Sequence, residues 1–266
     1  MYEHDMPMLR TVIAPNPSPM TLDGTRTFVV GGRAPAVIDP GPDDGNHLAR
    51  LVAALDGRAP VAILLTHLHP DHAAGAPALA SRTGASILQG RPGVATELLS
   101  HHPSGVLFDG EAIETDGGPL RAISTPGHSP EHLSFFWSGK HAPGEGALFV
   151  GDLLMGSGDT TLVAPPEGDL YDYLVSLTRL EELGASVLYP SHGPPITDPP
   201  AALARYRAHR LERIEQVADA LAASPEAAAE ELVAAIYGSS LHPSLKPAAA
   251  GSIRAMMRYL ARTQAI

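Results

Sequence analysis

Apolar residues in this chain are grouped in short runs that end at glycine, proline or aspartate, a pattern typical of short buried strands. Near the N-terminus, the runs at residues 27–30 and 36–39 flank Gly31 and Gly32, which predicts two strands joined by a short turn. Other runs predict further strands at residues 61–65, 87–88, 106–108, 112–113, 121–124, 133–137, 147–150 and 187–189.

A helical period is clearest between Leu170 and Leu183, where leucines recur at three-residue spacing and predict an amphipathic helix. Residues 46–55 and 73–81 predict two more helices, and the second of these leads away from a histidine-rich segment. Because the strands come in pairs before the helices, we expect an α/β fold made of sheets with helices packed outside them.

The composition changes near Asp198, where alanine-rich helical segments begin to follow one another. Asp198 is a good helix N-cap and Pro199 a good first helical residue, so a long helix is predicted to about residue 223. Ser224-Pro225 repeats this pattern before a second helix to about residue 237, and Pro247 opens a third to about residue 262. The chain therefore divides into two predicted parts, residues 1–198 and a C-terminal helical module of residues 199–266.

The histidine-rich segment, Thr66-His67-Leu68-His69-Pro70-Asp71-His72, directly follows a predicted buried strand. In an extended segment, residues two apart point the same way, so His67 and His69 can reach one point where a further ligand would complete a metal site. Asp71 and His72 lie beyond the kink that proline favours, and they can begin a second site. Three imidazoles and one carboxylate suit zinc, and also iron or manganese.

Three more candidate ligands each follow a predicted strand within a short turn that contains proline or glycine: His128, Asp152 and His192. Taken singly, such residues are more common as packed histidines or turn-forming aspartates. The same context occurs at four strand ends of one chain, however, and this recurrence favours a shared metal site. Asp39 and His132 are candidates for partners that orient the imidazoles.

In this order, the four motifs resemble those of the metallo-β-lactamase superfamily, over roughly residues 10–198. The resemblance implies an αββα sandwich with metal ions at one edge of the paired sheets. It also implies a ligand set in which one metal is held by His67, His69 and His128, the other by Asp71, His72 and His192, and both by a bridging Asp152.

Two cations about 3.5–4 Å apart can share a water molecule and lower its pKa toward roughly 7, which gives a metal-bridged hydroxide at neutral pH. One metal also polarises the scissile carbonyl or phosphoryl oxygen, and Asp71 can accept a proton from the water as well as bind metal. We therefore expect a hydrolase that cleaves an ester, thioester or phosphodiester bond in a small-molecule substrate. Its expected cofactors are two divalent ions, with zinc as the first choice and iron or manganese as alternatives.

Finer motifs resemble the β-lactamase-like protein 2 subgroup of this family. They lie at residues 16–25, 151–154, 170–177, 189–194 and 205–210, and the helical tail resembles part of a winged helix. The animal member of the subgroup is an endoribonuclease for single-stranded RNA, so RNA cleavage is the main alternative. A glyoxalase II-type thioesterase and a persulfide dioxygenase with a single iron are further alternatives. Antibiotic hydrolysis is not expected, because Asp152 stands where true β-lactamases lack a bridging aspartate.

The composition narrows the range of partners. With 44% hydrophobic residues in 266, the chain can form a sizeable core, and the absence of cysteine excludes thiolate ligands and disulfides. The net charge of −11 opposes nonspecific binding of nucleic acid, and the arginines of the C-terminal segments are more typical of a solvated helix face. The sequence has no apolar leader and no apolar run of membrane-spanning length, so we expect a cytoplasmic location and no membrane partner.

Overall fold

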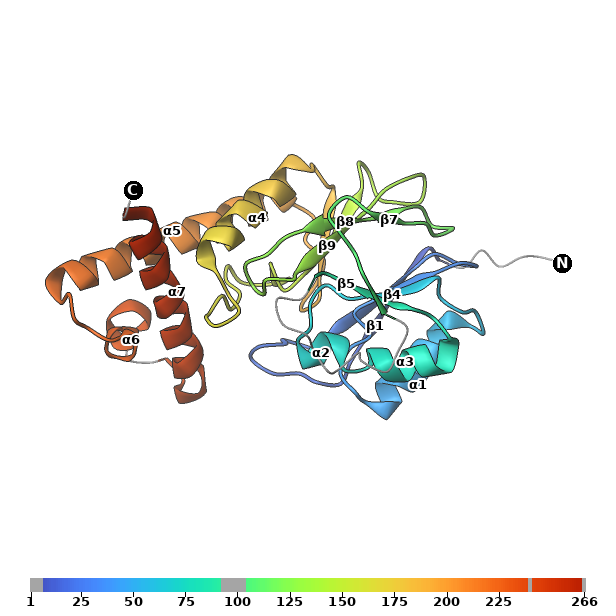
Figure 1. Cartoon of the computed structure of the whole chain (residues 1–266), viewed down its shortest axis with the longest axis horizontal. Helices are drawn as coiled ribbons and strands as arrows, with labels where there is room; N and C mark the ends of the chain where they lie inside the picture. The colour runs from blue at the N-terminus through green and yellow to red at the C-terminus, as the bar shows by residue number, and fades with distance from the viewer. Residues whose placement is uncertain (1–6, 92–103, 239–240, 265–266) are drawn as a thin grey trace.

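The computed structural model describes residues 7–91, 104–238 and 241–264. Its centre is a pair of β-sheets (Figure 1). The first sheet has the strand order β1-β2-β3-β4-β5-β6 and the second the order β11-β10-β9-β8-β7. The strands of the first sheet are β1 Leu9–Ile13, β2 Arg26–Val30, β3 Ala36–Ile38, β4 Ala62–Leu64, β5 Ile87–Gln89 and β6 Ser104–Val106. The strands of the second sheet are β7 Ala112–Ile113, β8 Leu120–Ser124, β9 Leu133–Trp137, β10 Ala147–Gly151 and β11 Val187–Pro190.

Helices cover the outer faces of both sheets, as Figure 1 shows. Three lie on the first sheet: α1 Gly45–Leu55, α2 Pro70–Ala73 and α3 Ala76–Thr83. The later helices are α4 Leu170–Glu182, α5 Pro199–Ala223, α6 Ala229–Tyr237 and α7 Lys246–Gln264, with the short 3-10 helix η2 Pro243–Leu245 before α7. In Figure 1, α5 runs alongside α4 and then leads away from the sheets to α6 and α7. The predicted αββα sandwich with a helical C-terminal module is confirmed.

Side-chain alternation along each strand builds two apolar layers around the first sheet. Phe28 and Val30 of β2 face the second sheet, and the Phe28 ring lies 4.9 Å from that of Phe149 in β10. Val29 points the opposite way and packs with Leu48 and Leu55 of α1. Strands buried on both faces in this way read as unbroken apolar runs in the sequence.

The second sheet, α4 and the C-terminal helices share one apolar core. It contains Leu148 of β10, Leu177 of α4, Tyr206 of α5 and Ile253 of α7, all of which are buried. This core passes across the predicted boundary at residue 198. The C-terminal helices are therefore packed against the sandwich through a continuous interior, and the division into two parts stays a prediction.

Several local predictions differ from the structure. The strand expected at residues 106–108 lies earlier, as β6 at Ser104–Val106. Strand β1 was not expected; it pairs antiparallel with β2 along the edge of the first sheet, where tertiary pairing outweighs a weak local pattern. The helix expected at residues 73–81 is two helices, because the chain becomes helical at Pro70, the first residue of α2, and α3 begins at Ala76. The histidine-rich segment therefore enters a helical turn before its last two ligand candidates.

The second helix of the C-terminal module begins at Ala229 and not at Pro225. Ser224 instead ends α5, since its N–H bonds to the Ala220 carbonyl and the following proline cannot continue the helix. Glu231 accepts a hydrogen bond from the N–H of Ala228 and so satisfies an amide at the start of α6. In the part of the chain that the structure describes, no helix has both the length and the apolar character needed to cross a membrane.

Candidate metal centre

The seven predicted ligands lie together at one edge of the sandwich, although they come from four separate segments. Their nitrogen and oxygen atoms form three overlapping groups, and within each group the atoms lie within 4.8 Å of one another. The groups are His67 with His69 and His128, His67 with His72 and Asp152, and Asp71 with His72 and His192. A cluster of this kind can hold metal ions.

Asp152 lies between two sides of this cluster. Its Oδ2 atom is 3.7 Å from His128 Nε2, while its Oδ1 atom is 3.3 Å from His192 Nε2 and 3.4 Å from His72 Nε2. On the second side, Asp71 Oδ2 is 3.3 Å from His192 Nε2. The two oxygens of one carboxylate therefore face different sets of imidazoles, the arrangement expected of a bridging residue.

The backbone conformation just before Asp152 requires glycine. Gly151 has φ +51°, in the left-handed region, and a Cβ atom there would come within 2.5 Å of His132 Nε2 and 2.8 Å of Thr66 Oγ1. The end of β10 can therefore pass close to the histidine-rich segment. This close approach brings the Asp152 carboxylate to the ligands that follow β4.

Each of the five imidazoles has one ring nitrogen directed outward at an oxygen atom. His67 Nδ1 lies 3.0 Å from Thr66 Oγ1, His69 Nε2 2.8 Å from Glu167 Oε2, His72 Nδ1 2.9 Å from Asp39 Oδ2, His128 Nδ1 2.7 Å from the Leu162 carbonyl, and His192 Nδ1 3.4 Å from the Gly24 carbonyl. An N–H on the outer nitrogen leaves a lone pair on the inner one. These contacts therefore select the tautomer in which the imidazoles can bind a metal.

Asp39 organises the base of the cluster from a fully buried position. Its carboxylate accepts hydrogen bonds from the backbone N–H and the hydroxyl of Thr66, from His72 Nδ1–H and from the Ser191 hydroxyl. It has φ 49°, an uncommon conformation for a residue other than glycine. Asp39 thus joins the ends of β3, β4 and β11 through a single side chain.

His132, the other predicted orienting residue, contacts the cluster in a different way from Asp39. It is fully buried, and its Nδ1 lies 3.0 Å from the Thr125 hydroxyl, while its ring is 5.4 Å from that of His67. Among the described residues it makes no hydrogen bond to any of the five imidazoles. It therefore packs against the cluster and does not orient a ring through a hydrogen bond.

Glu167 was not among the sequence candidates. It lies in the loop before α4, 98 residues from the histidine whose outer nitrogen it contacts, and its side chain is 59% exposed. No strand end or motif marks this position in the sequence. Thr66 is another missed partner, although it immediately precedes His67 and its hydroxyl could have been recognised in the sequence.

The cluster combines neutral imidazoles with ionised carboxylates and cationic imidazoles. Burial lowers the pKa of both His67 and His128, so these imidazoles are neutral and their lone pairs are available. Burial acts to raise the pKa of Asp152, but nearby His72 and His192 hold it well below its usual range and the carboxylate is ionised. Burial likewise opposes charge on His192, whereas Asp152 and Asp71 raise its pKa to about 9.

Several inner atoms of the cluster are buried without a hydrogen-bond partner. They are His67 Nε2, His72 Nε2 and Asp152 Oδ1. A buried polar atom left unsatisfied costs about 1–3 kcal/mol, so three in one cluster indicate that the cluster binds groups from outside the chain. Nitrogen and carboxylate donors without sulfur fit zinc, iron or manganese.

A cavity of about 390 Å³ opens beside the cluster. The ligand candidates at its polar end are His69, Asp71, His128, Asp152 and His192. Its remaining wall is mostly apolar and includes Met20, Met155, Leu162 and residues of α7. The volume lies within the range of about 300–1,000 Å³ that is common for small-molecule sites.

The match to a protein family agrees with this geometry. Residues 21–192 match the model of the metallo-beta-lactamase superfamily, which is well over half of the chain. The chain belongs to this superfamily. It is thus a hydrolase of the metallo-beta-lactamase superfamily with histidine and aspartate groups able to hold metal, and the family predicted from its motifs is confirmed.

Individual relatives extend the likeness beyond the sandwich. The chain is 34% identical to the atrochrysone carboxyl ACP thioesterase of Aspergillus chevalieri, covering 88% of this chain and 74% of that protein. It is 30% identical to the beta-lactamase-like protein 2 homolog of Caenorhabditis elegans, covering 86% and 76%. A metallo-beta-lactamase family protein from Thermus thermophilus superposes with a TM-score of 0.75 at 25% identity, covering 97% and 95%. Some other curated relatives are longer, and the chain spans 60 to 66% of their length.

Proposed function

We propose that the chain is a hydrolase that uses two divalent metal ions, zinc in the first instance, to cleave ester or thioester bonds of substrates with an apolar acyl group. The main support is the cavity, in which a mostly apolar wall leads directly to five of the ligand candidates, His69, Asp71, His128, Asp152 and His192. His67, His69 and His128 would hold one ion, Asp71, His72 and His192 the other, and Asp152 both. Bound there, the ions would supply Lewis acidity and lower the pKa of a water molecule.

Asp71 has the position of a proton acceptor. Burial acts to raise its pKa, but the neighbouring imidazoles of His192 and His72 hold it far below the usual range, so the carboxylate is ionised. Its side chain is 30% exposed and lines the cavity, whereas that of His192 is 1% exposed. Asp71 therefore offers a carboxylate that an incoming water molecule can reach.

The character of the cavity favours an acyl group over a phosphodiester. A phosphate-binding site is typically lined by arginine, lysine or backbone amides, and the described lining of this cavity contains no lysine or arginine. The name of the Aspergillus chevalieri relative, a thioesterase, supports the same choice. The Caenorhabditis elegans relative supports placing the chain in the β-lactamase-like protein 2 subgroup.

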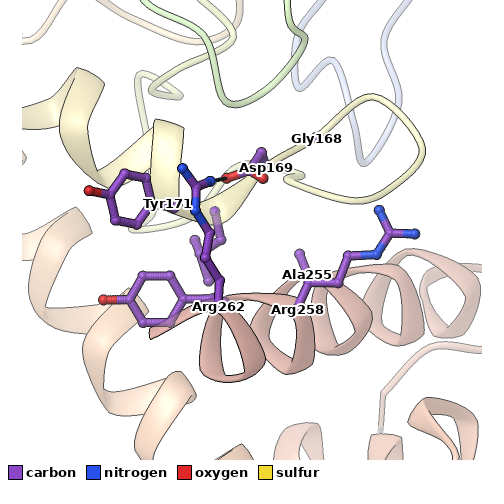
Figure 2. Close-up of a pocket in the computed structure, with 8 residues that line it drawn as sticks. Gly168, Asp169, Tyr171, Ala255, Arg258 and Arg262 are labelled. Atoms are coloured by element: carbon purple, nitrogen blue, oxygen red, sulfur yellow. Dashed lines mark ion pairs between the residues drawn. The ribbon is translucent and has the colours of Figure 1, made fainter. Parts of the chain in front are cut away.

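The arginines of the C-terminal helices argue against the RNA-cleaving alternative. Arg207 contacts Glu181, and Arg254 pairs with Glu230. Arg262 Nη1 lies 3.6 Å from Asp169 Oδ1, and the guanidinium lies over the ring of Tyr171. Figure 2 shows the ion pair between Arg262 and Asp169. Cations engaged within the chain are less available to the phosphates of a nucleic acid, and the net charge of −11 opposes its approach.

Metal content and substrate range together test this proposal. The zinc-reconstituted protein is assayed on an acyl thioester, a nitrophenyl ester, a nitrophenyl phosphodiester and single-stranded RNA, each with a chelator control, while bound metals are counted by mass spectrometry. We expect two metals per chain and chelator-sensitive cleavage of the thioester or ester. Cleavage of RNA or the phosphodiester alone would refute the acyl specificity. One iron per chain with oxygen consumption on a persulfide would instead support the dioxygenase.

A further inference from the structure

One face of α7 forms a wall of the cavity. Leu245, at the end of η2, and Ala248, Ala249 and Ser252 of α7 all line the cavity and follow a spacing of three, four and seven residues. Side chains at this spacing share one face of a helix. On most helices such a stripe is filled by large apolar residues packed in a core, but here three of the four side chains are small.

The opposite side of the cavity comes from the sandwich. Met20 and Thr21, which precede β2, contribute one part of the wall, and Met155 and Leu162 of the loop after β10 contribute another. Ligand candidates of the metal centre line the same cavity. A bound acyl group could therefore extend from the cluster toward α7, with its carbonyl carbon at the polar end.

Packing on the other faces holds this wall in place. Ile253 and Met256 of α7 are fully buried in the core that α4, α5 and the second sheet share. On α5, the Tyr206 hydroxyl bonds to both the N–H and the carbonyl of Met155, at 2.9 and 3.1 Å. Because the backbone is fixed on both sides, the depth of the cavity depends mainly on the side chains that point into it.

This inference rests on the proposed hydrolase function. We propose that the wall formed by Leu245 of η2 and by Ala248, Ala249 and Ser252 of α7 determines the specificity for the acyl group. The substrates are thioesters or esters of apolar acids of medium chain length. In this reaction water supplies a hydroxyl to the acyl carbon and a proton to the leaving sulfur or oxygen, and the carbon–sulfur or carbon–oxygen bond breaks. The products are a thiol or alcohol and a carboxylic acid, which loses a proton to become the carboxylate. No other co-reactant is required. The small side chains at positions 248, 249 and 252 provide the space in which the acyl chain lies.

The test is an acyl-length series of N-acetylcysteamine thioesters, from acetyl to decanoyl, with the metal-loaded protein and three variants. Ala248→Leu adds three carbons to the wall, and Leu245→Ala removes three. Ala261→Leu makes the same exchange as the first variant on an exposed position of the same helix, and it serves as the control. Metal content and thermal unfolding are measured for each variant, because both should match those of the wild type.

We expect Ala248→Leu to lower kcat/KM for the longest accepted thioester by about 10-fold or more, while short thioesters are little affected. Leu245→Ala should shift the preference toward longer chains, and Ala261→Leu should leave the profile unchanged. Calorimetric titration with butyrate and octanoate gives a second measurement that does not require turnover. Ala248→Leu should weaken the binding of octanoate and leave the binding of butyrate unchanged.

The outcomes separate this inference from the proposed function. If the wild type cleaves thioesters but neither Ala248→Leu nor Leu245→Ala changes the length profile or octanoate binding, the assignment of the wall is wrong and the hydrolase function stands. If the metal-loaded wild type cleaves no thioester or ester of any length, both are wrong. If Ala248→Leu does not fold, the opposite shift expected of Leu245→Ala still decides the question.

Discussion

The metal centre and the α7 wall line the same cavity but are built in opposite ways. At the metal centre, each imidazole is held by an oxygen partner, and one buried carboxylate, Asp39, accepts four hydrogen bonds. The α7 wall consists of small or apolar side chains whose positions depend on packing behind them. On the proposed function, the chemistry would depend on directional contacts that tolerate little change. The acyl specificity would depend on the cavity volume, which can change without loss of the reaction.

The largest expected effect is the loss of Asp152, which faces both sets of imidazoles. Asp152→Ala should reduce kcat/KM by more than about 100-fold, because substitutions one layer further out already cost about 10–100-fold. Bound metal, counted by mass spectrometry, should fall at the same time. Activity close to that of the wild type with a full metal load would contradict the bridging position.

Removal of the metal by a chelator should destabilise the centre and leave the α7 wall intact. At a free metal concentration about 1,000-fold above Kd, the bound ion stabilises the fold by about 4 kcal/mol, and a chelator removes this contribution. Differential scanning calorimetry should show a lower Tm that is restored by added zinc. Octanoate binding, by contrast, should persist in part in the metal-free protein, and its complete loss would show that the two regions are not separable.

Asp39→Ala should damage both stability and metal binding, since it leaves buried donors at Thr66, His72 and Ser191 without an acceptor. We expect a loss of about 3–5 kcal/mol in unfolding free energy and a weakening of metal affinity by about 10–100-fold. Asp116→Ala is the matched control. Asp116 also accepts hydrogen bonds from several backbone N–H groups, those of residues 32–34, but its own side chain is exposed, in the loop between β7 and β8. It should lower stability measured by chemical denaturation and leave zinc affinity unchanged; equal zinc affinities in the two variants would contradict the role of Asp39.

The smallest expected effect is that of Glu167→Gln. This side chain is largely exposed, and the amide oxygen can still accept the hydrogen bond from His69, so we expect a decrease in zinc affinity of about 10-fold at most. Competition with a chromophoric chelator measures it. Glu182→Gln on the exposed side of α4 is the control. If Glu167→Ala has no larger effect than this control, the contact with His69 does not tune the ligand.

Many strands and candidate metal ligands of this protein could be predicted from the sequence, because each depends on a short stretch of neighbouring residues. Apolar runs marked the strands, and the two-residue period of an extended segment placed His67 and His69 on one side before any tertiary contact was known. The recurrence of a ligand after each of four strands also marked the edge where they meet, since strands of packed sheets end together. Helix starts were less reliable, as Pro225 shows, because a proline that opens a helix and one that ends the preceding helix look alike.

Only the tertiary structure shows which atoms contact the outer nitrogens of the metal-binding histidines and which helix forms the far wall of the cavity. Glu167 and the Leu162 carbonyl contact His69 and His128 across large sequence separations, and neither belongs to a motif. The C-terminal helices gave no chemical signal in the sequence, yet α7 lines the cavity because the core behind it fixes its orientation. Local patterns determine elements and ligand types, whereas a cavity is the space between elements, and its shape exists only once the long-range packing has formed.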